Sequence, residues 1–299
     1  MDGKAVAYVL VQTSRPSQLL LIVGIYVLGV VIAAANGVTP DESAVVAGLP
    51  PLVFCAASVH YANEFADVDT DAQTDRTPFS GGSGALAETG LGRTIPLTAG
   101  LVSLVAGLAS AVGLWVTGWI PTSAVSLLGI IVVAGWQYSV RPLKLAWRGF
   151  GEVTNAALGG VALPAYGAAV VGGPLGRVIL ASVPFALVVL LNLFATQWPD
   201  RDADAAVGKQ TLAVRWQPRI LRISYVGIAV AAGVALVALH TVPSPAVLPR
   251  PVVLASLPVV PLVVWGGWGY TRRHVPLPTV AAMVSLAALQ LLGWLWTLS

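Results

Sequence analysis

Two short acidic clusters contain the residues of this chain that are best suited to chemistry. The first runs Asn63-Glu64-Phe65-Ala66-Asp67-Val68-Asp69-Thr70-Asp71, and the second runs Asp200-Arg201-Asp202-Ala203-Asp204. Each cluster directly follows a long apolar run. Carboxylates this close repel one another unless cations bridge them, and hard oxygen ligands suit Mg²⁺, which often shares its coordination shell with substrate phosphates. The two clusters therefore predict a divalent-metal site that clamps a diphosphate.

The spacing within each cluster places its key residues on one face of a helix. If each cluster continues the apolar helix before it, Asn63, Asp67 and Asp71 lie at positions i, i+4 and i+8. Asp200 and Asp204 form the equivalent pair. An isolated acidic loop is more often a solvated connector, but the repeated spacing favours a metal site. Basic side chains that can neutralise the outward phosphate oxygens are Arg15, Arg76, Arg141, Lys144, Arg148 and Lys209.

Several features near the clusters have two interpretations each. The glycine-rich segment 77–84 either wraps a phosphate with backbone N–H groups or is a flexible linker, and it is not a Walker loop because no Gly-Lys-Ser/Thr follows. His60 either touches the site or is a satisfied histidine near a helix end, which is the commoner case. Asn192 and Gln197 precede the second cluster on a membrane helix, where they serve either the site or interhelical hydrogen bonding. Asp69 points away from the predicted face.

The composition identifies the elements that must hold these residues. The chain has 299 residues, of which 57% are hydrophobic and 10% charged, with a mean hydropathy of +0.82. A soluble domain carries roughly 25% charged residues, so the sequence predicts an all-α polytopic membrane protein. Apolar windows of about 20 residues are long enough to cross the bilayer as helices. The nine predicted spans are residues 18–36, 44–62, 95–117, 122–140, 153–172, 178–197, 223–241, 252–270 and 278–297.

The distribution of charge predicts that the polar chemistry lies on one side of the membrane. With the N-terminus in the cytoplasm, all 16 Lys and Arg residues except Arg177 and Arg250 fall on the cytoplasmic side, as the positive-inside rule requires. Of the 13 acidic residues, only Asp41 and Glu42 fall outside. We therefore expect a protein of the cytoplasmic membrane with its active site on the cytoplasmic side.

The chain is expected to form one domain, residues 1–299, with two pseudo-repeated halves of about 1–140 and 141–299. The two clusters each follow an even-numbered span, which suggests this internal repeat. The net charge of +3 gives no indication of nucleic-acid binding, because acids and bases share the same face. The single cysteine, Cys55, lies in an apolar run and is expected to be a small buried hydrophobic residue.

Four stretches of the sequence match the motifs of one known family. They are Arg15-Pro16; Asn63-x-x-x-Asp67-x-x-x-Asp71; the middle loop Tyr138-Ser139-Val140-Arg141-Pro142-Leu143-Lys144-Leu145 with Arg148-Gly149-Phe150-Gly151-Glu152; and Asp200-x-x-x-Asp204 with Gly208-Lys209-Gln210-Thr211-Leu212-Ala213-Val214-Arg215. In these places, and across its whole length, the chain resembles the UbiA superfamily of intramembrane prenyltransferases.

The resemblance implies a fold, an activity and a set of site residues. It implies nine helices around a central cavity, and Mg²⁺-dependent transfer of a prenyl chain from an isoprenyl diphosphate to a lipophilic acceptor in the bilayer. The metal-binding and catalytic residues would be Asp67, Asp71, Asp200 and Asp204, with Asn63 as a further metal ligand. The diphosphate-binding residues would be Arg15, Asn63, Arg76, Tyr138, Ser139, Arg141, Lys144 and Lys209.

The identity of the acceptor is less constrained by the motifs. The runs 143–152 and 208–212 look most like dihydroxynaphthoate prenyltransferases of menaquinone synthesis, which implies an aromatic quinone precursor as acceptor. Glu64 stands where many members have Asp, and Gly84 stands where related sequences often have Arg. Carotenoid, ether-lipid and chlorophyll types of acceptor therefore stay open.

Two functions from other classes also fit a metal-binding membrane protein. A divalent-cation transporter would need ionisable groups near the bilayer midplane, and the predicted spans have almost none. A CDP-alcohol phosphotransferase would carry an Asp-Gly-x-x-Ala-Arg signature, which is absent from this sequence. The prenyltransferase hypothesis therefore leads.

Overall fold

The computed structural model describes residues 2–73 and 81–299, and this part of the chain is helical throughout, without strands. Nine of the described segments are long and apolar enough to cross a membrane. Six are single helices: α2 (Pro16–Ala35), α6 (Thr94–Val116), α7 (Thr122–Ser139), α10 (Leu175–Gln197), α13 (Pro218–Thr241) and α16 (Leu277–Trp296). Three combine two helices: α3 (Glu42–Ala47) with α4 (Leu49–Asp71), α8 (Gly151–Ala157) with α9 (Leu163–Val170), and α14 (Arg250–Ser256) with α15 (Val260–Gly269).

The structure confirms the nine predicted spans and their order. The largest difference is at the second span, which was predicted over 44–62 and runs over 42–71. This span is longer because the first acidic cluster continues the helix instead of forming a loop. Among the described residues, four short α-helices and one 3₁₀ helix, η1 (Leu145–Arg148), lie outside the spans; the α-helices are α1 (Gly3–Ser14), α5 (Ala85–Thr89), α11 (Arg201–Ala206) and α12 (Leu212–Arg215).

Prolines explain why two of the composite spans are irregular. Pro164 has no backbone N–H and its ring meets the carbonyl of Gly160, so the turn Leu158–Ala162 between α8 and α9 widens into a π-helix. The span formed by α14 and α15 has a 3₁₀ turn at Leu257–Val259, which contains Pro258. In both spans the chain stays helical across the irregular turn, which keeps backbone polar groups paired inside the bilayer.

Helices α2 and α9 pack with their backbones in direct contact. A methyl group at Gly29 would overlap the carbonyl oxygen of Pro164, and one at Gly167 would overlap the carbonyl oxygen of Tyr26. Small residues at such crossings let membrane helices approach closely, because packing contacts rather than water exclusion hold helices together in lipid. This pair fixes the relative position of the first and fifth spans.

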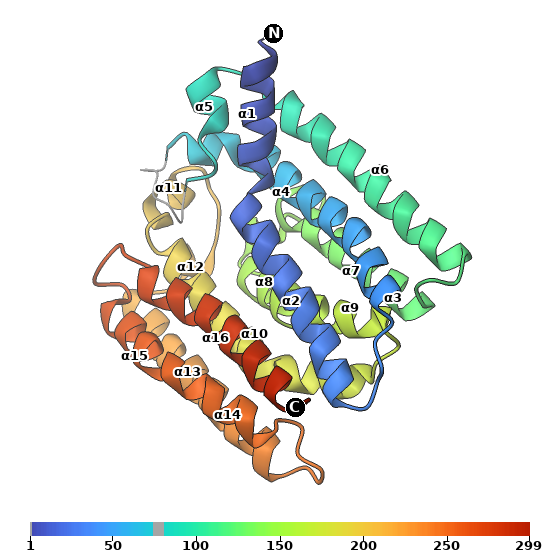
Figure 1. Cartoon of the computed structure of the whole chain (residues 1–299). Helices are drawn as coiled ribbons and strands as arrows, with labels where there is room; N and C mark the ends of the chain where they lie inside the picture. The colour runs from blue at the N-terminus through green and yellow to red at the C-terminus, as the bar shows by residue number, and fades with distance from the viewer. Residues whose placement is uncertain (1, 74–80) are drawn as a thin grey trace.

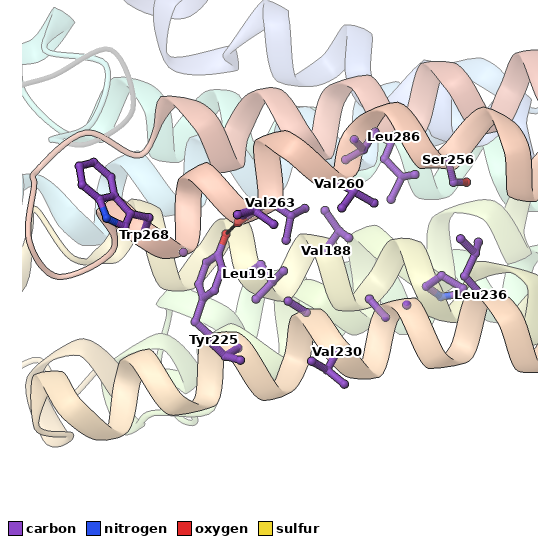
Figure 2. Close-up of a pocket in the computed structure, with 18 of the residues that line it drawn as sticks. Val188, Leu191, Tyr225, Val230, Leu236, Ser256, Val260, Val263, Trp268 and Leu286 are labelled. Carbon is purple, nitrogen blue, oxygen red and sulfur yellow. Dashed lines mark hydrogen bonds between the residues drawn. The ribbon is translucent and has the colours of Figure 1, made fainter.

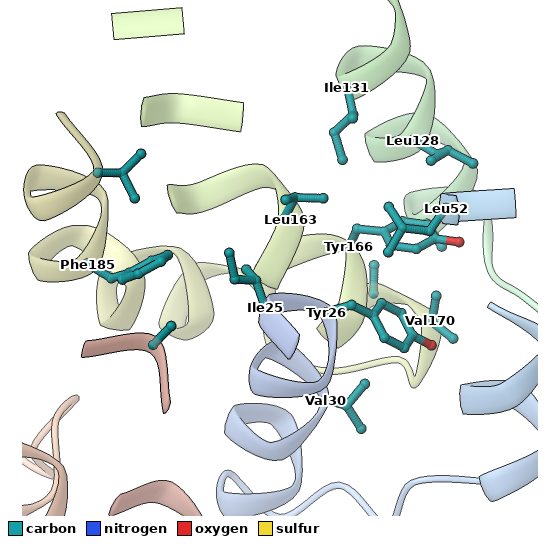
Figure 3. Close-up of a cluster of buried hydrophobic side chains, with 14 of the residues drawn as sticks. Ile25, Tyr26, Val30, Leu52, Leu128, Ile131, Leu163, Tyr166, Val170 and Phe185 are labelled. Atoms are coloured by element: carbon teal, nitrogen blue, oxygen red, sulfur yellow. The ribbon is translucent and has the colours of Figure 1, made fainter. Parts of the chain in front are cut away.

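The main core lies between α2, α4, α7, α9 and α10, and Figure 3 shows its apolar side chains meeting from these helices. Tyr26 and Tyr166 are fully buried there with their rings 5.7 Å apart. Their hydroxyls donate hydrogen bonds to the carbonyls of Val45 (2.8 Å) and Gly48 (2.9 Å) at the junction of α3 and α4. The two tyrosines therefore satisfy carbonyls that the helix break leaves unpaired.

The short helices gather at one end of the bundle, which we call the polar end. Figure 1 shows α1, α5, α11 and α12 at this end, where the last turns of α4 also lie. Helix α1 packs on α5 through a small apolar cluster of Val9, Ala85 and Leu86, with Val68 of α4 against it. The polar end therefore brings together segments that are far apart in the sequence.

Candidate active site

The first acidic cluster occupies the last turns of α4, as the spacing predicted. Because α4 is continuous to Asp71, the residues Asn63, Asp67 and Asp71 share one face of the helix. Asp69 points away from this face: its side chain is 81% exposed and pairs with Arg93 at 3.4 Å. Two carboxylates and one amide of this cluster thus point in a common direction at the polar end.

The second acidic cluster is built differently from the first. Helix α10 ends at Gln197, and Asp200 directly precedes a separate short helix, α11, that carries Asp204. The expectation that this cluster continues its preceding helix was wrong, because Pro199 has no backbone N–H with which to continue the hydrogen bonds of α10. Asp204 is buried, whereas Asp202 is exposed.

Lys209 lies between the two clusters. Its Nζ is 3.2 Å from Oδ1 of Asp204, and its backbone N–H donates to the Asp204 carbonyl at 2.8 Å. Burial alone would lower the pKa of Lys209, but the carboxylates of Asp67 and Asp204 outweigh burial and raise that pKa above its usual value. Because the Asp67 carboxylate acts on the pKa of both Lys209 and Asp204, the two clusters lie close enough at the polar end to interact electrostatically.

Asp204 itself is held by two partners. Burial raises the pKa of its carboxyl, and Lys209 and the Thr211 hydroxyl, which donates at 3.5 Å, act in the opposite direction. Burial is the larger effect, so the carboxylate form of Asp204 costs free energy unless more positive charge is supplied. A cation bound beside Asp204 would remove that cost.

Arg15 and Glu64 form the other side of the site. Arg15 joins α1 to α2 with a left-handed backbone (φ 55°), and its guanidinium lies 3.6 Å from the buried Glu64 carboxylate. Glu64 also accepts hydrogen bonds from the hydroxyl and the backbone N–H of Ser83. Glu64, which had no predicted role of its own, therefore contacts both Arg15 and the end of the glycine-rich segment beside the first cluster.

The glycine-rich segment is described from Gly81 onwards. Gly82 has a positive φ (66°), and a Cβ at this position would overlap the Asp71 carboxylate. The backbone of this part of the segment therefore lies directly against the first cluster. Arg76, a predicted diphosphate-binding residue, and residues 77–80 of the segment lie outside the described residues.

The Tyr138-Ser139 pair lies against the first cluster. The Ser139 hydroxyl, at the end of α7, donates a hydrogen bond to the amide oxygen of Asn63. Tyr138 lies near Asn155 of α8 and close enough to Lys209 and Asp67 to interact with their charges. Both residues therefore border the site, and the Asn63 oxygen is already engaged by a neighbour.

The cations of the middle loop lie further out. Lys144 has a left-handed backbone (φ 45°) and places its ammonium 3.9 Å from the centroid of the Trp147 ring. Arg148 donates to the carbonyl of Pro142 at 3.3 Å, and Arg141 is exposed. Of the predicted diphosphate-binding cations within the described residues, Arg15 contacts Glu64 and Lys209 contacts Asp204, whereas the middle-loop cations form no ion pair with a cluster carboxylate.

Glu152, the last residue of the middle-loop motif, had no predicted role but lies close to the second cluster. It is fully buried, and its Oε1 accepts a hydrogen bond of 2.7 Å from the backbone N–H of Leu212, just beyond Lys209. Gln210 N–H also donates to the carbonyl of Trp147 at 3.0 Å. These bonds tie the segment after the second cluster to the middle loop. The signal in the sequence was a glutamate that opens an otherwise apolar span.

The structure shows the surroundings of His60, Asn192 and Gln197, for which the sequence left two interpretations open. His60 is the satisfied histidine, since its Nδ1 lies 2.7 Å from the carbonyl oxygen of Ser14. The side-chain oxygens of Asn192 and Gln197 on α10 are buried without a hydrogen-bond partner among the described residues, as is Oδ1 of Asp67. The side-chain oxygens of Asn192 and Gln197 therefore make no interhelical hydrogen bond within the described residues.

The donor set fits Mg²⁺ only as part of a shared coordination shell. The available atoms are oxygens of carboxylates and amides, which Mg²⁺ prefers. Within residues 2–73 and 81–299, however, no group of three or more His, Cys, Asp or Glu side chains is close enough to hold a metal ion by itself. Mg²⁺ usually keeps several waters and shares its shell with substrate phosphates, and the arrangement suits that mode of binding.

The described residues thus form a polytopic helical membrane protein in which two acidic clusters lie at one end, near a shared lysine. The sequence matches the model of the UbiA prenyltransferase family over residues 21–289. The chain therefore belongs to the UbiA prenyltransferase family. No curated protein matches the chain.

Solved structures share the fold at low sequence identity. A UbiA homologue from Archaeoglobus fulgidus bound to DMAPP and Mg²⁺ superposes with a TM-score of 0.69 and 16% identity, covering 96% of this chain and 98% of that chain. The apo structure of a UbiA homologue from Aeropyrum pernix K1 has a TM-score of 0.72 and 14% identity, covering 93% and 98%. A digeranylgeranylglyceryl phosphate synthase has a TM-score of 0.64 and 12% identity, covering 96% of both chains.

Proposed function

We propose that this prenyltransferase cleaves an isoprenyl diphosphate at the polar end of the bundle, with Mg²⁺ as cofactor, and joins the prenyl chain to a lipophilic acceptor. The observation that carries the proposal is the position of Lys209, whose ammonium lies 3.2 Å from Asp204 and within the field of Asp67. One diphosphate can therefore face carboxylates from both clusters together with a shared cation. The Archaeoglobus homologue bound to GPP and Mg²⁺ supports the same donor class and metal.

The charged residues have distinct tasks in this reaction. The C–O bond between the prenyl carbon and the diphosphate breaks, and its electron pair leaves with the diphosphate. Lys209, whose pKa is raised, stays protonated, and Arg15 is always charged, so both neutralise the departing group. The oxygen atoms that would hold the metal belong to Asp67, Asp71, Asp200 and Asp204. Bound Mg²⁺ supplies further stabilisation of charge on the departing diphosphate.

The acceptor completes the reaction in a site that excludes water. An electron pair of the acceptor forms the new bond to the prenyl carbon, and the acceptor loses one proton. The surrounding apolar helices keep water from the reactive allylic carbon. We propose an aromatic quinone precursor such as dihydroxynaphthoate as acceptor, supported by the likeness of the Arg148-Gly149-Phe150-Gly151-Glu152 run to enzymes with that acceptor. The Lys and Arg distribution supports an active site on the cytoplasmic side of the cytoplasmic membrane.

Reconstituted protein tests the proposal. Wild type, Asp67→Asn and Asp69→Asn are each placed in liposomes with a prenyl diphosphate, one candidate acceptor at a time, and either Mg²⁺ or a chelator. We expect wild type and Asp69→Asn to release diphosphate and form prenylated product only with Mg²⁺, because Asp69 is exposed and points away. Asp67→Asn should be inactive. Equal turnover of all three proteins, or full activity in chelator, would overturn the proposal, and the mass of the product identifies the acceptor.

A further inference from the structure

An elongated apolar groove lies in the C-terminal half, away from the acidic clusters. It has a volume of about 620 Å³ and is bounded by α10, α13, α14, α15 and α16. Figure 2 shows side chains of α10, α13 and α15 pointing into it, with Trp268 at one end and Leu236 and Ser256 towards the other. Its walls include Val230 and Val264, which are 59% and 65% exposed, so the groove opens sideways towards the lipid.

The groove exists because α13 and α15 pack on α10 and α16 rather than closely on each other. Tyr225 crosses its floor, with its hydroxyl donating to the carbonyl of Val263 at 3.2 Å. Gly233 of α13 lines the groove, and a Cβ there would meet open space. From Arg222 to Leu236 the groove follows 14 residues of α13, about 21 Å of helix, which exceeds the ~15 Å of one leaflet's hydrocarbon. The space therefore suits a long hydrocarbon chain.

The charges at the groove are all of one sign and lie at one end. Of the described residues that line it, only Arg222 and Arg272 are charged, and both belong to the polar end. Arg272 donates to the carbonyl of Trp268 at 3.2 Å, and neither arginine has an acidic partner within salt-bridge distance in the described part of the chain. The deep polar pair is already satisfied, since Gln290 donates to the Ser256 hydroxyl at 3.3 Å. Among the described lining residues, the groups left without an oppositely charged partner are thus the two arginines at the polar end.

We propose that this groove binds one anionic phospholipid of the bilayer, with an acyl chain along α13 and its phosphate between Arg222 and Arg272. Guanidinium groups pair well with phosphate oxygens, and the groove opens into a phase made of acyl chains. The anionic leaflet of a cell membrane supplies such a lipid at the side where basic residues collect. The bound chain fills the space between α13 and α15 that no helix fills.

A series of aromatic contacts connects the groove to the second acidic cluster. The ring of Tyr225 on the groove floor packs at a tilt against that of Tyr270, with 5.2 Å between centroids, and Tyr270 contacts Trp198 at 6.3 Å. Trp198 directly precedes the break that leads to Asp200. A lipid that steadies Tyr225 therefore steadies the aromatic support of the second acidic cluster.

Native mass spectrometry of the full-length protein tests the headgroup contact. The protein is exchanged into detergent with equal phosphatidylglycerol and phosphatidylcholine, and retained lipids are counted. Wild type should retain one phosphatidylglycerol in preference to phosphatidylcholine. Arg222→Gln should weaken this retention about fivefold, whereas Arg219→Gln, with the same charge change three residues earlier on α13, should not. Equal retention of both lipids by wild type, or equal loss in both variants, would refute the site.

A second pair of variants tests the acyl-chain contact. Gly233→Leu fills the groove and should reduce retention of phosphatidylglycerol, whereas Gly227→Leu, on α13 with open space and outside the groove, should retain it. Thermal unfolding in neutral detergent checks that each variant is folded. If Gly233→Leu is not folded, the comparison of Arg222→Gln with Arg219→Gln decides the test. Displacement of the lipid by a prenyl diphosphate in stoichiometric amount would instead make the groove a substrate site and overturn the lipid assignment. Prenyl transfer, measured separately, does not decide this proposal.

Discussion

The two acidic clusters share a spacing but not a scaffold. The first is carried by the last turns of one unbroken 23-residue helix, α4. The second lies on the six-residue helix α11, after a break at Pro199, and is held in place by contacts from elsewhere: Lys209 on Asp204, and Leu212 on Glu152. Two clusters with the same spacing in the sequence are therefore held in place in different ways. The first cluster is positioned by the bundle, whereas the second is positioned by its partners.

The largest test of this comparison is removal of one buried carboxylate charge from the second cluster. Asp204→Asn should lower kcat by about 10²–10³-fold, since preorganised electrostatic groups of active sites are worth that much. Asp202→Asn is the matched control, because Asp202 is exposed on the same short helix. Steady-state release of diphosphate in liposomes measures both. Similar rates for the two variants would mean that the second cluster is only a solvated connector.

The shared lysine should come next in effect. Lys209→Gln removes the cation that both clusters face and should lower kcat by about 10²-fold. Lys209→Arg keeps the charge but changes its shape, so it should restore part of the rate. Circular dichroism checks that both variants keep their helices. If Lys209→Gln and Lys209→Arg are equally inactive, the geometry of the ammonium matters more than its charge.

Substitution of the two buried glutamates, Glu64 and Glu152, tests how each cluster is held in place. Glu152→Ala cuts the link from α8 to Leu212 and should lower kcat about tenfold by releasing the second cluster, while the KM for prenyl diphosphate rises. Glu64→Ala loses the contacts with Arg15 and Ser83, but α4 still holds the first cluster, so its kcat should fall less. Hydrogen exchange gives a readout beyond activity. Faster exchange at residues 204–212 is expected in Glu152→Ala only.

The pH dependence of stability is the smallest expected effect. Burial raises the pKa of Asp204 in the folded state above its unfolded value, so the folded protein binds this proton more tightly. The free energy of unfolding without divalent cation should therefore gain a contribution as the pH falls through that raised pKa, and lose it as the pH rises. Asp204→Asn should remove this contribution. Denaturant unfolding of both proteins across pH measures it, and identical pH profiles would contradict the assignment.

Most of the fold could be predicted from the sequence because lipid imposes strong local rules. A helix that crosses the bilayer needs about 20 apolar residues, and this requirement alone located the nine spans. The common face of Asn63, Asp67 and Asp71 followed from helical periodicity once the helix continued. These predictions needed no knowledge of which helices touch.

The rest of the site depends on contacts between segments that are distant in the sequence. Nothing in the residues around Glu64 or Glu152 indicates that their partners are Ser83 and Leu212, because such pairs form only after the bundle assembles. The break before Asp200 had a local signal in Pro199, which the repeated acidic spacing obscured. The groove beside α13 had no local signal, since it results from the way neighbouring helices pack.

The backbone contact between α2 and α9 fixes the distance between these two helices. Gly29 lies 14 residues, or about 21 Å, along the helix from Arg15, and Gly167 belongs to the span that begins beside Glu152. Because the helix backbones are in direct contact at these glycines, no side chain lies between them that could adjust if their separation changed. A single methyl group at either glycine would push the two backbones apart. The separation of the first and fifth spans is thus fixed within the bundle, about four helical turns from Arg15.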